Sequence, residues 1–132
     1  MIASNFADQN GVTVTADMNA VFNNCIFWGD NGIIDDEVII SKQGANPFNV
    51  LFDHTLYKAL ADPSNTTLTA VIKNIDPAFD SIDISHNYYD FRITKNALAP
   101  GIDQGAPTGF LKDLDENNRV VGLTDIGCYE KP

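Results

Sequence analysis

Short runs of β-branched and aromatic residues, each closed by Asn, Asp, Gly or Pro, follow one another through the first half of the chain. Runs of this length and composition are typical of strands and are too short for most helices. They predict an all-β fold. The runs are 12–15, 20–22, 25–28, 37–41, 50–52 and 68–72.

Two of these runs echo each other. Residues 23–28 (N-N-C-I-F-W) align with 48–53 (F-N-V-L-F-D), which places Asn24 and Asn49 25 positions apart, and Asn74 lies 25 positions further on. A fixed period of this length indicates successive coils of a solenoid. We therefore expect Asn24 and Asn49 on neighbouring strands about 5 Å apart. The asparagines would then form an amide ladder, or they would simply punctuate surface turns.

One segment has helical rather than strand spacing. Leu56, Ala59 and Leu60 recur at intervals that place them on one helical face, and Asp62-Pro63 follows as a stop signal. We expect one or two helical turns over 55–61.

The charge balance narrows the classes of partner. Acidic residues number 18 against 8 basic ones, for a net charge of −10. Such a chain is a poor ligand for nucleic acid and for anionic membrane surfaces. No stretch approaches the roughly 18 apolar residues of a membrane span. An Asp-rich and Asn-rich surface suits contact with carbohydrate or Ca²⁺, although solubility alone explains it as well.

Three motifs stand in order near the end of the chain: A-P-G-I-D-Q-G at 99–105, D-L-D-E-N-N-R at 113–119 and D-I-G-C-Y-E at 125–130. They resemble the C-terminal tail of bacterial secreted and surface proteins built on a right-handed parallel β-helix, the pectate-lyase-like solenoid family. There the motifs run S-P-A-I-D-A-G, D-L-D-G-N-P-R and D-I-G-A-Y-E. Here Glu116 replaces the family's Gly and Asn118 its Pro. The backbone geometry of this turn therefore does not follow from the resemblance.

The resemblance implies a short right-handed parallel β-helix of a few coils. Residues 1–75 would form its terminal coils and residues 76–132 a C-terminal cap packed on the last coil, all within one structural domain. Upstream coils of the same polypeptide would be its neighbours, because a solenoid end needs a cap or another coil. The resemblance also implies a secreted protein or one on the outer surface of a bacterium, although residues 1–5 show no signal peptide.

The expected function is a non-catalytic solenoid and cap region that contacts polysaccharide. One alternative is part of a polysaccharide lyase or glycosidase, and another is a β-sandwich carbohydrate-binding module, because strand patterns do not separate parallel from antiparallel sheets. Lyases of this fold use a Lys or Arg as the base. The basic residues considered for that role are isolated in sequence, so no catalytic residue is assigned: Lys42, Lys58, Lys73, Arg92 and Lys95.

Trp28 and Tyr88 are the candidates for carbohydrate contact. Trp28 stands at a strand-to-turn edge before Gly29, and Tyr88 lies in the segment 85–89 (S-H-N-Y-Y). Aromatic rings at such positions can stack on sugars in a binding groove. Packing in the core is the alternative for both rings.

The oxygens of Asp113, Asp115 and Asn117 occupy alternate positions, as in the first half of a Ca²⁺ loop. The rest of an EF-hand is absent, because Asn118 stands where Gly is needed and Thr124 where Glu is needed. A tight structural turn is the other interpretation of this segment. Ca²⁺ is thus the one cofactor that the sequence leaves open.

Two carboxylates and two thiols receive structural roles. Asp103 and Asp125 lie next to glycines or turns in the terminal motifs, so we expect their carboxylates to accept hydrogen bonds from backbone N–H groups. Cys25 and Cys128 stand in apolar surroundings, and we expect buried free thiols rather than a disulfide.

Overall fold

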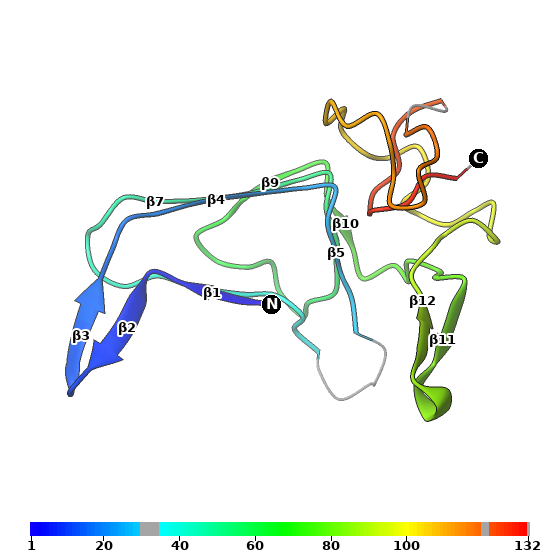
Figure 1. The fold of residues 1–132 in the computed structure, drawn as a ribbon. Coiled ribbons are helices and arrows are strands. Elements are labelled where there is room, and N and C mark those ends of the chain that lie inside the picture. Colours follow the sequence, from blue (N-terminus) through cyan, green and yellow to red (C-terminus); the bar gives the residue numbers. More distant parts are fainter. Residues whose placement is uncertain (30–34, 120–121, 132) are drawn as a thin grey trace.

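The computed structural model describes residues 1–29, 35–119 and 122–131, and there the chain is all-β (Figure 1). The one helical element among these described residues is the 3₁₀ turn η1 (Ile84–His86). No helix in the described ranges is long and apolar enough to cross a membrane. The strands are β1 (Ile2–Ser4), β2 (Phe6–Gln9), β3 (Val12–Thr15), β4 (Met18–Asn23), β5 (Ile26–Phe27), β6 (Ile39–Ser41), β7 (Phe48–Asp53), β8 (Leu56–Tyr57), β9 (Thr67–Thr69), β10 (Ile72–Lys73), β11 (Ser81–Asp83) and β12 (Tyr88–Asp90).

Two parallel sheets organise residues 18–73. One sheet has the order β4-β7-β9 and the other β5-β8-β10. In both sheets the first two strands pair residues 30 positions apart, and the next two pair residues 16 positions apart. The chain therefore makes three passes through the same two sheets: β4 and β5, then β7 and β8, then β9 and β10. β1 and β6 form a further parallel pair.

A single residue with positive φ turns the chain from one sheet into the other on every pass. The three residues are Asn24, His54 and Ala70, with φ of 51°, 48° and 47°. Asn enters this left-handed region readily, whereas His and Ala do so less often. The corner is thus set by a repeated backbone conformation, and its side chain changes from pass to pass.

The expected amide ladder of Asn24, Asn49 and Asn74 is wrong. Asn49 pairs with Asn19 instead, and its Nδ2 donates a hydrogen bond to the Oδ1 of Asn19 over 2.8 Å. Asn24 occupies the corner position that His54 fills on the next pass. The period of 25 fails because the connections between passes differ in length, so the register steps are 30 and 16.

The expected helix over 55–61 is also wrong, because β8 occupies its centre. β8 pairs on both sides, with β5 and with β10. Leu56 and Tyr57 are both fully buried on the opposite faces that a strand gives to consecutive residues. Thr55 supports the corner before them by donating its hydroxyl to the carbonyl of Phe22 over 3.0 Å. Burial on both faces overrides the helical spacing.

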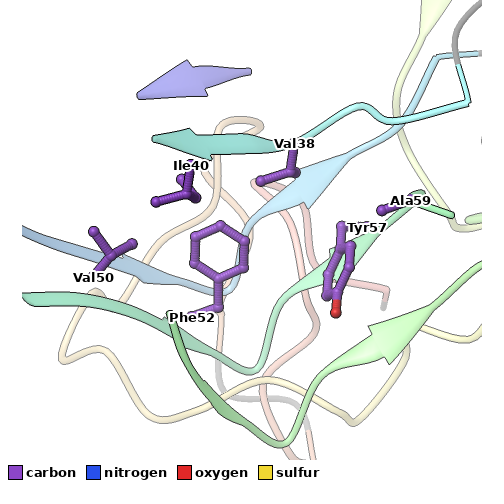
Figure 2. Packing of buried hydrophobic residues seen from close by; sticks show 6 residues of the cluster. All are labelled: Val38, Ile40, Val50, Phe52, Tyr57 and Ala59. Carbon is purple, nitrogen blue, oxygen red and sulfur yellow. The ribbon is translucent and has the colours of Figure 1, made fainter. Parts of the chain in front are cut away.

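The hydrophobic core lies between the passes and β6. Its buried members are shown in Figure 2: Val38, Ile40, Val50, Phe52, Tyr57 and Ala59. Phe52 lies near the centre and meets the rings of Phe22 and Tyr57 edge to face, with centroids 5.2 Å and 6.0 Å away. Because Phe22 and Phe52 are register partners, this contact also joins two passes.

Two antiparallel hairpins extend the fold. In β2–β3 the turn is Asn10-Gly11, with φ of 55° and 79°. Positive φ at both central residues is the geometry of a type I′ turn, for which Asn-Gly is the favoured pair. The second hairpin joins β11 to β12 through η1.

The C-terminal tail lies beside the corner of the first pass (orange to red in Figure 1). Asn24 Nδ2 donates to the carbonyl of Ala106 over 2.8 Å, and the N–H of Ala106 donates back to Asn24 Oδ1 over 2.7 Å. The N–H of Gly127 donates to the Asn24 carbonyl over 2.9 Å. The tail therefore satisfies the polar groups of the first corner.

Energetic coupling between Phe22 and Phe52 tests this register. We expect a double-mutant cycle of Phe22→Leu and Phe52→Leu, measured by urea unfolding, to show a coupling of about 0.5–1.5 kcal/mol, because edge-to-face rings stabilise one another. Phe22→Leu combined with Phe110→Leu is the control, since Phe110 is exposed. Additive effects for Phe22 and Phe52 would contradict the stacking of the two passes.

Candidate functional site

Three adjoining cavities meet at Trp28 and Phe79, and together we call them the Trp28 groove. Trp28 directly follows β5, and Phe79 precedes β11. The largest cavity has a volume of about 510 Å³, and Phe91 lines it as well. Ile82 and Tyr89 line one of its neighbours. The groove therefore lies between the end of β5 and the β11–β12 hairpin, and rings dominate its walls.

Strand alternation decides which tyrosine of β12 faces the groove. Ile82 pairs with Tyr89 and shares its face, whereas Asp83 pairs with Tyr88 on the opposite face. Tyr88 is 56 % exposed and lies outside the cavities around Trp28. The structure thus brings Trp28 together with Tyr89. The alternation of side chains along a strand could have separated the two tyrosines at the sequence level, because adjacent residues of a strand point to opposite faces.

The aromatic rings of the groove contact one another. Tyr89 stacks on Phe91 with centroids 6.0 Å apart and planes inclined by 12°, and Phe91 meets Phe79 edge to face at 5.2 Å. The ammonium of Lys58 lies 5.9 Å from the centroid of the Trp28 ring. Asp76 lines the groove at one end, where its Oδ1 accepts the N–H of Ala78 over 2.7 Å. Flat apolar faces with a few polar groups at the rim suit a ligand with both apolar and hydroxyl-bearing sides.

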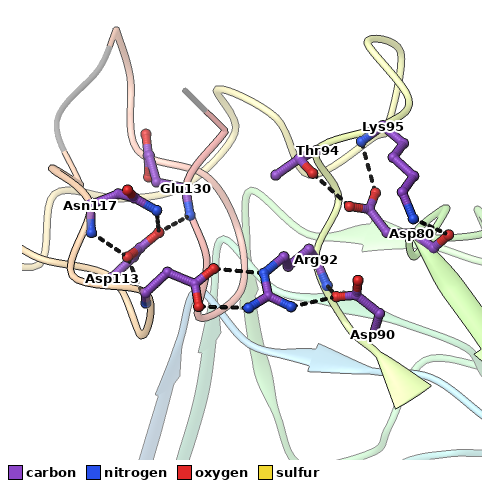
Figure 3. Close-up of polar contacts among 9 residues, drawn as sticks. Asp80, Asp90, Arg92, Thr94, Lys95, Asp113, Asn117 and Glu130 are labelled. Atoms are coloured by element: carbon purple, nitrogen blue, oxygen red, sulfur yellow. Dashed lines mark hydrogen bonds and ion pairs between the residues drawn. The ribbon is translucent and has the colours of Figure 1, made fainter. Parts of the chain in front are cut away.

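In the acidic turn at 113–117, the carboxylate of Asp113 accepts hydrogen bonds from backbone N–H groups (Figure 3). Asp113 Oδ1 accepts the N–H groups of Asp115 and Asn117, each over 2.8 Å. Asp113 Oδ2 accepts the N–H of Glu130 over 3.0 Å. Glu116 takes a left-handed conformation with φ of 64°, at the position where the resembling family has Gly. One carboxylate therefore closes the turn and fastens it to the last residues of the tail.

Asp115 is held by arginine. Its two oxygens accept hydrogen bonds from Arg92 Nε and Nη2, both over 2.6 Å, and Arg92 Nη1 donates to Asp90 over 2.8 Å (Figure 3). The hydrogen bond from Arg92 also holds the pKa of Asp90 below its ordinary value. The guanidinium lies 4.7 Å from the centroid of the Tyr129 ring. This cluster joins β12 to two parts of the tail.

The residues proposed for Ca²⁺ do not form a cage as they are arranged. A Ca²⁺ ion takes six to eight oxygen ligands, whereas the carboxylates of Asp113 and Asp115 face N–H groups. Within residues 1–29, 35–119 and 122–131, no group of three or more His, Cys, Asp or Glu side chains could hold a metal ion. The geometry agrees with the structural turn.

Asp103 and Asp125 have the capping role that the sequence predicts. Asp125 Oδ1 accepts the N–H of Asp103 and its Oδ2 that of Lys131, both over 2.7 Å. Asp103 Oδ1 accepts the N–H of Leu123 over 3.0 Å. Asp125 thus connects the first and third terminal motifs, and Asp103 connects the first motif to the segment just before the third.

A serine, a histidine and an aspartate lie together at η1 but do not form a catalytic triad. Ser85 Oγ lies 3.0 Å from His86 Nδ1, and Asp83 Oδ2 lies 2.8 Å from the same nitrogen. A triad needs the aspartate on one ring nitrogen and the serine on the other. Hydrogen bonds from Ser85 and His86 lower the pKa of Asp83, which caps η1. The cluster stabilises an exposed turn.

The cysteines are free, as expected, but they are less buried than expected. Cys25 is half-buried, and Cys128 is exposed. Ile126 takes the fully buried position of its segment, which leaves Cys128 at the surface.

Comparisons of the chain with protein-family models, with curated proteins and with solved structures found no match.

The carboxylate of Asp113 makes a testable contribution to stability. Burial raises the pKa of this carboxyl group, but hydrogen bonds from the N–H groups of Glu130 and Asn117 lower it by more than burial raises it. The pKa therefore lies below its ordinary value. A folded-state pKa below the unfolded value of about 3.9 stabilises the fold above that pH, and the stabilisation is lost as the pH falls. We expect Asp113→Asn to cost about 1–3 kcal/mol at pH 7 in urea unfolding and clearly less near pH 3. Leu114→Ala, at an exposed neighbour, should show no such pH dependence. An Asp113→Asn effect that stays constant with pH would contradict this role.

Proposed function

We propose that the chain is the C-terminal part of a right-handed parallel β-helix from a secreted or surface protein of a bacterium, with a structural rather than a catalytic role. Residues 1–75 would be its last coils and residues 76–132 the closing tail. The observation that carries this proposal is the shared register: two different parallel sheets step by 30 and then by 16 residues. Passes that advance together in separate sheets are how coils of a solenoid stack.

The contacts among the terminal motifs support the same proposal. Asp125, in the third motif, binds the N–H of Asp103 in the first. Arg119, in the second motif, donates to the carbonyls of Asp125 and Gly127 in the third. The residues that carry the resemblance are thus the residues that hold the tail together. The spacing of the three motifs in sequence allows their residues to form these hydrogen bonds.

The first pass has an edge that suits a further coil. β4 pairs with β7 and β5 with β8, and in the described part of the chain neither has a strand on its other side. On the second pass, inward-facing Phe52 and Tyr57 are fully buried. Their register partners on the first pass, Phe22 and Phe27, are only half-buried. Upstream coils of the same polypeptide are therefore the neighbours that we propose for this edge.

The geometry favours this role over both alternatives. A β-sandwich is built from antiparallel sheets, whereas the three passes pair in parallel. A lyase or glycosidase site needs an acid and a base, or a base beside a bound cation, at one place in a groove. The carboxylates Asp103, Asp113 and Asp125 accept backbone N–H groups within the tail instead. We infer that the part of the chain described here supplies structure and not turnover.

Removal of the last motif tests the closing role of the tail. We expect a chain that ends at Thr124 to aggregate or unfold, because it loses Ile126, which is 1 % exposed, together with the carboxylate of Asp125 that accepts the N–H of Asp103. Burial of one such side chain is worth about 1.5–3 kcal/mol, a large share of the stability of a small domain. Light scattering and thermal unfolding measure the result.

A chain that ends at Glu130 is the matched control and should stay folded. A soluble monomer ending at Thr124, with a melting temperature close to that of the full chain, would show that residues 125–132 do not close the fold.

A second candidate function is polysaccharide contact through the Trp28 groove. The rings of Trp28, Tyr89 and Phe91 come from different segments and converge on adjoining cavities. Flat rings stack on the apolar faces of sugars, and Lys58 and Asp76 at the rim can bond hydroxyl groups. The net charge of −10 disfavours polyanionic glycans, so a neutral polysaccharide is the proposed ligand.

Trp28→Ala tests this candidate, with Tyr88→Ala as its matched control. We expect Trp28→Ala to weaken binding to a neutral polysaccharide about tenfold or more in affinity electrophoresis, because a stacking ring is lost. Tyr88→Ala should bind as the unaltered chain does, because Tyr88 lies outside the groove. Equal effects of the two substitutions, or no binding by the unaltered chain, would reject the groove as a glycan site.

A further inference from the structure

The corner of the first pass and the tail meet at a close seam around Asn24. Asn24 is buried, and its side-chain amide bonds the backbone of Ala106 in both directions. Its carbonyl accepts the N–H of Gly127 over 2.9 Å. Three hydrogen bonds to one residue fix the two segments relative to each other. The residues that flank these contacts are therefore held in place as well.

Cys25 and Cys128 flank this seam on its two sides. Gly127 contacts both neighbours of Cys25: it bonds the Asn24 carbonyl, and a Cβ built on it would lie 3.2 Å from Ile26 Cδ1. Cys128 is the next residue after Gly127. The two cysteines also line the same cavity at the end of the Trp28 groove. Two independent observations thus place both cysteines beside the same seam.

We propose that Cys25 and Cys128 form an intramolecular disulfide under oxidising conditions and that this bond locks the tail to the first pass. A disulfide needs Cα atoms about 4.4–6.8 Å apart. Cys25 directly follows the acceptor and Cys128 the donor of the hydrogen bond from the Gly127 N–H to the Asn24 carbonyl, so each cysteine lies one residue from the same contact. Each thiol is free in the structure, and neither is needed for the bonds of the seam.

The bond would form by exchange with a small disulfide such as oxidised glutathione. One cysteine thiolate attacks the oxidant and forms a mixed disulfide, and one glutathione thiolate leaves. The second cysteine thiolate then attacks the protein sulfur of the mixed disulfide and releases the second glutathione. Two cysteine thiols are oxidised, one glutathione disulfide is reduced to two thiols, and these thiols keep the two protons. The exposed Cys128 is the residue expected to react first.

The reaction rate should rise with pH. Partial removal of water from the sulfur raises the pKa of both thiols above the ordinary value, although Cys128 is exposed as a residue, and this keeps the thiolate fraction low at neutral pH. The loop closed by the bond runs from residue 25 to residue 128. A loop of this length restricts the unfolded chain strongly, so the disulfide should stabilise the fold.

The test is incubation of the folded chain with oxidised glutathione at pH 8.5, followed by blocking of free thiols, mass spectrometry and thermal unfolding. We expect both free thiols to disappear while the protein stays monomeric, and mass spectrometry of a digest to show a peptide pair joined through residues 25 and 128. The melting temperature should rise by about 10 °C, and dithiothreitol should reverse this rise. Cys25→Ser and Cys128→Ser are the controls. Each should retain one free or glutathionylated thiol and gain no stability.

Several outcomes would overturn the proposal. They are a folded chain that keeps both thiols open to alkylation, one that stops at glutathione adducts, and one that forms only disulfides between molecules. Unfolding in urea before oxidation distinguishes these cases from an inactive oxidant, because an unfolded chain with two thiols must react. Oxidation of the unfolded chain without oxidation of the folded one would show that the seam holds the two sulfurs apart.

Discussion

The left-handed corner at Asn24 is the constraint on which the other parts of this structure depend. Its backbone turns the chain from β4 into β5, and the same turn recurs at His54 and Ala70. Its side chain and carbonyl bind the tail at Ala106 and Gly127. One residue therefore sets the shape of a pass and the position of the closing segment. Asn suits both tasks, because it enters the left-handed region readily and carries a donor and an acceptor.

The tail shows how a segment almost without strands is kept in one conformation. Its buried carboxylates are Asp113, Asp125 and Glu130, and they accept N–H groups that a ladder would otherwise satisfy. Buried backbone groups that lack a partner are costly, so each of these caps removes a penalty. The high content of acidic residues thus has a structural use in this region, besides its effect on solubility.

Part of the fold followed from local pattern, and part did not. The strands around 12–15, 20–22 and 50–52 were predicted correctly, because β-branched and aromatic runs bounded by turn residues favour strands. The hairpin turn at Asn10-Gly11 was missed although its signal was present. The register was predicted wrongly because the connections between passes differ in length, and the helix over 55–61 failed because β8 has strand partners on both sides. The Trp28 groove is lined by Trp28, which the sequence singled out, and by Tyr89 rather than by the predicted Tyr88.

The amino-acid sequence was enough to predict the all-β class, the positions of about half of the strands and the capping roles of Asp103 and Asp125, because these depend on a residue and its near neighbours. The tertiary structure alone decided the register steps, the place of the tail at the first corner and the meeting of Trp28 with the β11–β12 hairpin. Those features join residues far apart in the chain. The free energy that stabilises these features comes from packing and hydrogen bonds that exist only once the passes are stacked. A local sequence pattern therefore does not predict them.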